Sequence, residues 1–120
     1  MSTKTLFALF LLTFLSCIGK KSTLAPIQPE ESAPVFCSIS FFSIGYGIDG
    51  QSLKSVQNWA QQKKDSVVLQ QTPWGREGEV DVCLRSIHNE TEIQRWLTDL
   101  KGILARAKNC RISNEKSCRK

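Results

Sequence analysis

Apolar and polar positions alternate along three stretches of the chain in the way that β-strands require. Residues 35–44 (VFCSISFFSI), 65–72 (DSVVLQQT) and 79–87 (EVDVCLRSI) are rich in β-branched or aromatic side chains and lie beside turn-forming residues. Successive side chains of a strand point to opposite faces of a sheet. The alternation therefore groups Cys37, Ile39 and Phe41 on one face of the first strand, and sets Val80, Val82 and Leu84 against Asp81, Cys83 and Arg85 in the third.

Two other stretches carry apolar residues at helical spacing. The first covers residues 51–63, and Asp49 precedes it as a candidate cap. The second opens at Asn89 with Glu92 three residues later, which is a capping-box arrangement. The second helix gives the clearest periodic signal in the chain. The apolar positions are Leu53, Val56 and Ala60 in the first helix, and Ile93, Trp96, Leu97, Leu100, Ile103 and Leu104 in the second.

This order of elements predicts an α+β fold, a β-α-β-β-α two-layer sandwich with both helices on one face of the sheet. If residues 111–113 add a fourth strand, the order becomes the ferredoxin-like β-α-β-β-α-β. We expect one small domain over residues 35–120, ending in a basic C-terminal tail. A domain of this size buries a modest core and gains from covalent cross-links.

The N-terminal segment, residues 1–16, is typical of a signal peptide. Lys4 precedes an apolar run over residues 5–15, which is too short to cross a bilayer as a helix. The run ends in FLSC at Cys17, which resembles the lipobox of bacterial lipoproteins, with Phe14 and Leu15 at positions where that motif more often has leucine and a small residue. The three prolines and the polar residues that follow, up to residue 34, predict a flexible tether.

The lipobox resemblance implies cleavage before Cys17, acylation of that cysteine (palmitate in the usual case) and attachment to a membrane of the cell envelope, the outer membrane in a Gram-negative host. A chain secreted without lipid and a retained N-terminal anchor are the alternatives. The stretches ISFFSIGYGIDG and WGREGEVDVC also resemble parts of small uncharacterised bacterial lipoproteins. That second resemblance implies no particular activity.

The cysteine count fits an exported protein. Of five cysteines, lipidation of Cys17 would leave an even number, which suggests two disulfides. One arrangement joins Cys110 to Cys118 and Cys37 to Cys83, although the last pair would need one strand reversed; in the other, both central cysteines bond to the tail. Spacing and composition predict neither a metal site nor a cofactor. The four candidate disulfide cysteines are Cys37, Cys83, Cys110 and Cys118.

Charge is concentrated at the C-terminal end. The formal net charge is +5, and residues 101–120 carry seven basic side chains against Glu115 alone. Such a tail can attract lipid headgroups or an anionic envelope polymer, and a solvated helix end is the plainer interpretation. We expect no specific nucleic-acid partner.

Two loops are candidate binding surfaces. Residues 45–50 (GYGIDG) match the spacing of a phosphate-binding glycine loop, but the next strand ends in Gln70-Gln71-Thr72 rather than an acidic residue, so we expect an ordinary turn. The second loop carries Trp74 and Arg76 at a hairpin tip. It is either a contact site for a partner protein or a place where Trp74 folds back over the sheet and Arg76 pairs with a neighbouring glutamate.

A catalytic hypothesis rests on the single histidine, His88, with Asp81 or Glu90 as its partner in a small hydrolase. Asn89 begins a glycosylation sequon, which would matter for a secreted eukaryotic effector. The sequence favours a third function, a non-enzymatic envelope lipoprotein that binds another protein or a surface polymer.

Overall fold

The structure is a computed structural model, and it describes residues 32–119. The predicted signal peptide, Cys17 and most of the predicted tether lie outside the described residues. The described residues form an α+β fold of four strands and two helices, which confirms the predicted class and adds the fourth strand. The elements are β1 (Val35–Phe41), α1 (Gly50–Gln62), β2 (Val68–Pro73), β3 (Val80–Arg85), α2 (Glu90–Ile103) and β4 (Cys110–Ser113).

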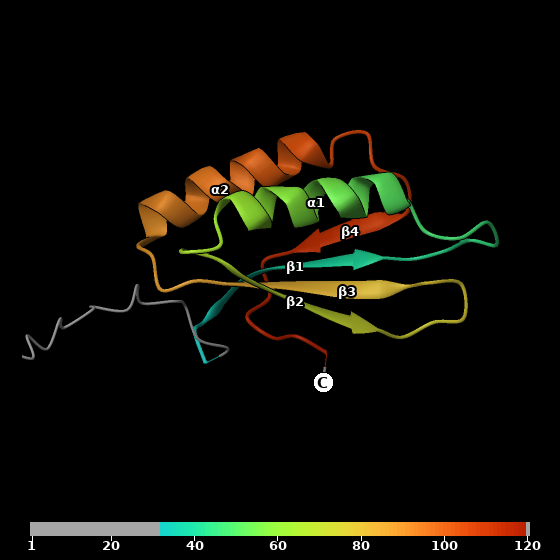
Figure 1. The fold of residues 1–120 in the computed structure, drawn as a ribbon, viewed down its shortest axis with the longest axis horizontal. Coiled ribbons are helices and arrows are strands. Elements are labelled where there is room, and N and C mark those ends of the chain that lie inside the picture. The colour runs from blue at the N-terminus through green and yellow to red at the C-terminus, as the bar shows by residue number, and fades with distance from the viewer. Residues whose placement is uncertain (1–31, 120) are drawn as a thin grey trace, which may run out of the picture.

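The strands form one antiparallel sheet in the order β2-β3-β1-β4. β1 and β3 are therefore the central strands, and the short β4 closes one edge beside β1. Both helices cover the same face of this sheet, and the C-terminal segment runs along the other face (Figure 1). The domain is a two-layer sandwich with one face of the sheet free of helices, which we call the open face.

The alternation predicted for the central strands is confirmed. Ile39, Phe41, Val82 and Leu84 are completely buried against the helices. Their strand neighbours point to the open face, where Ser40 and Asp81 are half-buried. Because the two faces differ in this way, one layer holds the apolar core and the other is left for polar side chains.

Each helix begins at the predicted cap. Asp49 Oδ1 accepts from the Ser52 backbone N–H at 3.0 Å, and Asn89 Oδ1 accepts from the Glu92 N–H at 3.0 Å. Only half of the predicted capping box forms, since the Glu92 carboxylate pairs with Arg95 at 3.3 Å. The helices contribute Val56, Trp59, Ala60, Trp96, Leu97 and Leu100 to the core.

β1 is shorter than predicted and ends at Phe41. Gly45 and Gly47 adopt φ angles of +112° and +83°, which side chains other than glycine rarely tolerate. The Ser43 hydroxyl accepts hydrogen bonds from the backbone N–H groups of both glycines, at 3.0 and 2.9 Å. These bonds curl the chain away from the ladder, so the residues predicted to continue the strand form a loop.

The chain enters the fold at one end of the sheet, and the loop after β1 and the β2–β3 hairpin lie at the other end (Figure 1). Tyr46 in that distal loop is 95% exposed. Among the described residues there is no helix with the length and apolar character that membrane crossing requires.

Candidate functional site on the open face of the sheet

The open face carries a row of polar side chains that crosses all four strands. In the register of the sheet, Thr72 lies opposite Asp81, Asp81 opposite Ser40, and Ser40 opposite Arg111. Directly opposed residues of an antiparallel pair have neighbouring side chains on the same face. The topology thus gathers four polar side chains from distant parts of the chain into one line.

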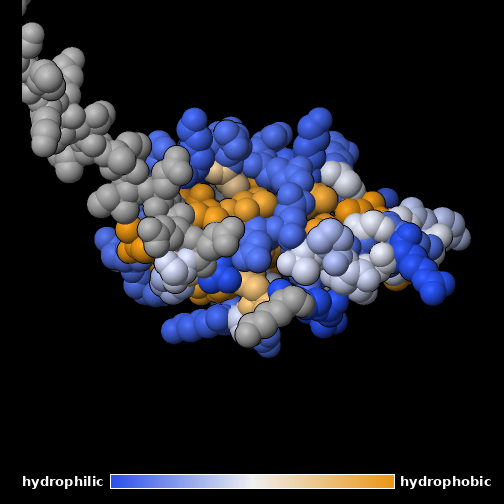
Figure 2. Space-filling model, turned by 60° about the horizontal axis from the view of Figure 1, so that its bottom comes forward, coloured by the Kyte–Doolittle hydropathy of each residue, from blue (hydrophilic) through white to orange (hydrophobic). Residues whose placement is uncertain are grey.

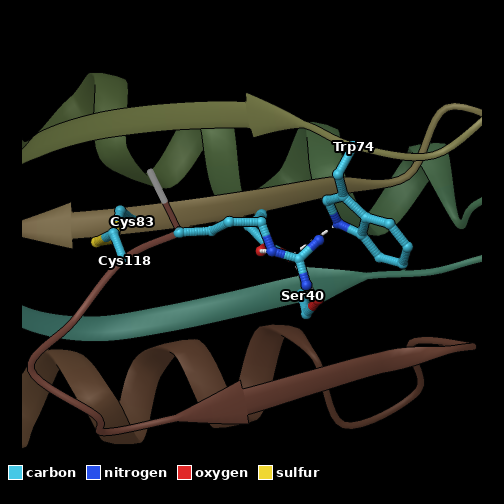
Figure 3. A network of polar contacts seen from close by, with 6 residues as sticks. Ser40, Trp74, Cys83 and Cys118 are labelled. Carbon is cyan, nitrogen blue, oxygen red and sulfur yellow. Dashed lines mark hydrogen bonds and ion pairs between the residues drawn. A yellow bond between two sulfur atoms is a disulfide. The ribbon is translucent and has the colours of Figure 1, made fainter.

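Asp81 is the centre of this row. Its Oδ1 accepts from the Ser40 hydroxyl at 2.5 Å and from the Trp74 indole Nε1–H at 2.9 Å. Its Oδ2 pairs with Arg119 Nε at 3.3 Å, and the side chain is only 15% exposed. Figure 3 shows Ser40 and the Trp74 indole on this face of the sheet, with the Cys83–Cys118 disulfide nearby. The carboxylate is therefore compensated by one cation and two neutral donors.

The cation reaches Asp81 because a disulfide holds the C-terminal end of the chain on the sheet. Cys83 and Cys118 are joined, with their Cα atoms 6.0 Å apart. Residues 114–119, which we call the strap, leave the edge strand β4 and pass over β1 to reach β3 (Figure 3). Arg119 is the next residue after Cys118, so the disulfide fixes the position of the Arg119 backbone on the sheet.

Arg119 also stacks on Trp74, with its guanidinium carbon 4.8 Å from the ring centroid. Beside this pair is a shallow hollow of about 370 Å³. Within residues 32–119, the Arg111 side chain at its wall makes no hydrogen bond or ion pair. We call this site the arginine hollow, and it is lined by Ser40, Phe42, Ser43, Trp74, Arg111 and Arg119.

Both hydrophilic and apolar side chains are exposed on the lower side of the molecule (Figure 2). Figure 2, which brings the lower side of the molecule forward, shows hydrophilic side chains around a smaller apolar band. Arg111 and Arg119 are exposed, and Trp74 is 40% exposed. The arrangement presents cations, hydroxyl groups and an aromatic ring to solvent, which are the groups that bind a polar anionic ligand.

The disulfide differs from the pairing that joined Cys110 to Cys118 and Cys37 to Cys83. Cys37 lies opposite Leu84 and faces the core, whereas Cys83 faces the strap, so these two thiols are on opposite faces of the sheet. Cys110 packs against the core edge opposite Phe41. In the alternative arrangement both central cysteines bond to the tail. The structure agrees with that arrangement for Cys83, which bonds to Cys118, but not for Cys37, which is free.

Cys37 and Cys110 are free thiols and cannot bond to each other. Phe41, the partner of Cys110, is four positions after Cys37 in β1, which is about 13 Å along a strand. A disulfide needs Cα atoms less than about 7 Å apart. Burial raises the pKa of the Cys37 thiol to about 11, despite the opposing effect of Lys101. Burial and the carboxylate of Asp49 also raise the pKa of Cys110.

The structure separates Trp74 and Arg76, the two residues that the sequence placed at a hairpin tip. Trp74 folds back over the sheet, as one of the two interpretations expected. Arg76 is exposed and, among the described residues, forms no ion pair. The Glu79 carboxylate instead accepts from the backbone N–H of Glu77 at 2.8 Å. Trp74 therefore lines the arginine hollow, and Arg76 does not.

His88 does not meet its proposed catalytic partner Asp81. The ring of His88 packs edge-on against Trp96 at 5.1 Å, on the helix side of the sheet. Asp81 is on the open face and already has three partners. His88 and Glu90 line the same hollow near the start of α2, but Glu90 accepts a hydrogen bond from Gln94.

The glycine-rich loop at residues 45–50 leads into α1, as predicted, but its helix end is occupied. Asp49 accepts from the Ser52 N–H and hydroxyl, and also from the Lys108 backbone N–H at 2.9 Å. The bond from Lys108 is the main cause that holds the pKa of the Asp49 carboxyl below its ordinary value, followed by the bonds from Ser52. A carboxylate therefore already fills the place that a phosphate would take.

Trp74 was predicted as a contact residue, Arg111 and Arg119 only as part of the basic tail, Asp81 only as a partner of His88, and Ser40 was not predicted at all. Strand alternation was a sufficient signal for Ser40, which faces opposite to Ile39 and Phe41. No local pattern signals Arg119, because its position depends on the path of the strap. Within the described part of the chain, no group of three or more metal-ligating side chains is present.

Comparison with known proteins gives no match to a protein-family model, a curated protein or a solved structure.

Proposed function

We propose that this protein is a lipoprotein of the bacterial cell envelope, cleaved before Cys17 and anchored through lipid on that cysteine. The observation that carries the proposal is the order of segments in the chain. An apolar run at residues 5–15 ends in FLSC, and a proline-containing stretch separates it from the folded domain. A chain with two or more acyl groups binds a bilayer stably. In a Gram-negative host the outer membrane is the expected location.

The proposed role of the domain is non-enzymatic binding of an envelope protein or an anionic surface polymer. The arginine hollow supports this role, because its two charged wall residues, Arg111 and Arg119, are both cations. Ser40 and Arg111, which line it, lie opposite each other on the open face of the sheet. Cations and an aromatic side chain exposed together are typical of binding surfaces.

We also propose a ferredoxin-like topology for the domain. The order β-α-β-β-α-β and the antiparallel sheet order β2-β3-β1-β4 support it. Each helix then connects two strands that run parallel with one antiparallel strand between them, which is the split βαβ arrangement. This fold carries many unrelated activities and so does not by itself define a function.

The test of the anchor is the intact mass of the protein purified from its native host, with a Cys17→Ala variant as the control. We expect the wild-type chain to begin at Cys17 with two or three acyl groups and to partition with membranes. The variant should lack the acyl mass and accumulate as an unprocessed or soluble species. An unmodified N-terminus at another residue of the wild-type protein would overturn the proposal in favour of a secreted, disulfide-linked protein.

A further inference from the structure

We propose that the arginine hollow binds an acidic sugar of an envelope polysaccharide, a pyranose unit that carries a carboxylate as well as hydroxyl groups. This inference rests on the proposed binding function and names the ligand class for it. It depends on three features of the hollow: its charge, the direction of its hydroxyl groups and its apolar wall.

The positive charge of the hollow favours an anionic ligand. Arg119 uses its Nε to pair with Asp81, and no other residue of the range 32–119 bonds to its two terminal NH₂ groups, which can bind a ligand. Arg111 has no polar side-chain partner within the described residues. Asp81 neutralises one of the two guanidinium groups, so these three side chains together carry a net charge of about +1 before a ligand arrives. A guanidinium binds a ligand carboxylate through two parallel hydrogen bonds.

The hydroxyl groups of the hollow favour a sugar over a simple anion. The Ser43 oxygen accepts two backbone N–H bonds, so its proton is left to donate outwards. The Ser40 hydroxyl donates its proton to Asp81, so its oxygen is left to accept. A sugar hydroxyl can both accept from Ser43 and donate to Ser40. A phosphate diester or a glutamate carboxylate ionised at neutral pH has no proton for Ser40.

The remaining wall is apolar and suits the C–H face of a sugar ring. Trp74 is 40% exposed, and Phe42 is half-buried beside it. Arg119 covers one face of the Trp74 ring, so the C–H groups of a pyranose, which carry partial positive charge, would meet Phe42 and the part of Trp74 that stays exposed. The hollow of about 370 Å³ is at the lower end of the range of small-molecule sites, which suits one sugar unit of a longer chain.

The experiment measures binding to the processed, full-length protein purified in detergent from cells that express the whole chain. The probe is an oligogalacturonate hexamer, followed by calorimetry and by tryptophan fluorescence. The comparison ligands are neutral maltohexaose, inorganic polyphosphate and polyglutamate. We expect oligogalacturonate to bind at least about tenfold more tightly than each of the three.

Arg111→Gln is the informative variant and Arg76→Gln its matched control, since both remove one exposed guanidinium that has no ion pair among the described residues. We expect Arg111→Gln to weaken oligogalacturonate binding about tenfold or more, and Arg76→Gln to change it less than about twofold. Ser40→Ala should also weaken binding, while polyphosphate binding stays unchanged. Thermal unfolding of each variant checks that the fold is intact.

Several results would overturn the inference: absence of oligogalacturonate binding, equal binding of polyphosphate or polyglutamate, or equal losses in the Arg111 and Arg76 variants. Equal binding of the other polyanions would show that the hollow attracts any polyanion by charge alone. Equal binding of maltohexaose would show that the arginines do not contribute to binding. The mass of the same sample reports the lipid on Cys17 separately. Failure of the anchor and failure of the sugar site are therefore distinguishable.

Discussion

The carboxylate of Asp49 accepts a hydrogen bond from the backbone N–H of Lys108 at 2.9 Å, across 59 residues of sequence. The same side chain caps α1 through Ser52. Asp49 thus fixes the start of the first helix to the loop that follows the second helix. The bond joins two connections at the distal end of the domain, so it contributes to tertiary structure as well as to the cap.

Replacing Asp49 should destabilise the domain in a pH-dependent way. We expect Asp49→Ala to lower the free energy of unfolding by about 1–2 kcal/mol at neutral pH, because the N–H groups of Ser52 and Lys108 lose their acceptor. The pKa of Asp49 is lowered in the folded state. Its charge therefore stabilises the fold above the ordinary carboxyl pKa, and that contribution is lost as the pH falls through the lowered value. Urea unfolding at several pH values measures the effect.

Two controls accompany this prediction. Asp49→Asn keeps a capping acceptor without the charge, so the stability difference between wild type and this variant should shrink as the pH falls below about 4. Asn89→Ala removes the cap of α2 alone and should cost about 1 kcal/mol without this pH dependence. A difference between wild type and Asp49→Asn that grew on acidification would contradict the assignment.

The Cys83–Cys118 disulfide should contribute substantially to stability. The bridge spans a sequence separation of 35 residues. Loop-closure entropy for that length corresponds to about 3–4 kcal/mol. We expect the double variant Cys83→Ser, Cys118→Ser to unfold at correspondingly lower guanidinium concentration, and reductant to shift the wild type but not the variant. Cys110→Ser, which removes a free thiol, should leave the sensitivity to reductant unchanged.

The two free thiols should differ in reactivity. Cys37 is fully buried with its pKa raised to about 11, whereas Cys110 is half-buried and its pKa is raised as well. Only the thiolate is a strong nucleophile. At pH 8, iodoacetamide should therefore modify Cys110 before Cys37 in the folded protein, and both at similar rates in guanidinium. Peptide mass mapping checks this order, and faster labelling of Cys37 would show that the strand is not buried as described.

The core depends on the apolar stripe of α2. Leu100 is completely buried among side chains from both layers, so Leu100→Ala should cost about 2–5 kcal/mol through lost burial and a residual cavity. Tyr46→Ala is the control, because that side chain is 95% exposed and its loss should change stability by less than about 0.5 kcal/mol. Chemical denaturation followed by far-UV circular dichroism gives both values.

Strong local patterns made most of the fold predictable. The periodicity of α2 and the alternation in β3 both reflect burial against a single layer, and the structure confirms them. The end of β1 was placed too late, because Ser43 and two glycines redirect a segment whose composition favours a strand. The fourth strand was predicted only as an option, because four residues at the edge of a sheet are too few to show a clear alternation of apolar and polar side chains.

The candidate site was less predictable because it depends on contacts between distant residues. Alternation places Ser40 and Asp81 on one face, but only the strand register makes them neighbours. Arg119 enters the site through the strap, which has no regular secondary structure and is positioned by a disulfide whose partner the sequence left open. Spacing in the sequence also suggested a pairing of His88 with Asp81, which the separation of the two layers prevents.

The position of β1 in the middle of the sheet has a mechanical consequence. The chain preceding Val35 is the connection through which any pull on the N-terminal side reaches the domain. Because β1 has hydrogen-bonded partners on both sides, such a pull would shear two ladders at once rather than peel one edge strand away. An edge strand has one ladder to lose, so detaching β1 by a pull from its N-terminal end breaks more hydrogen bonds than detaching an edge strand of the same length.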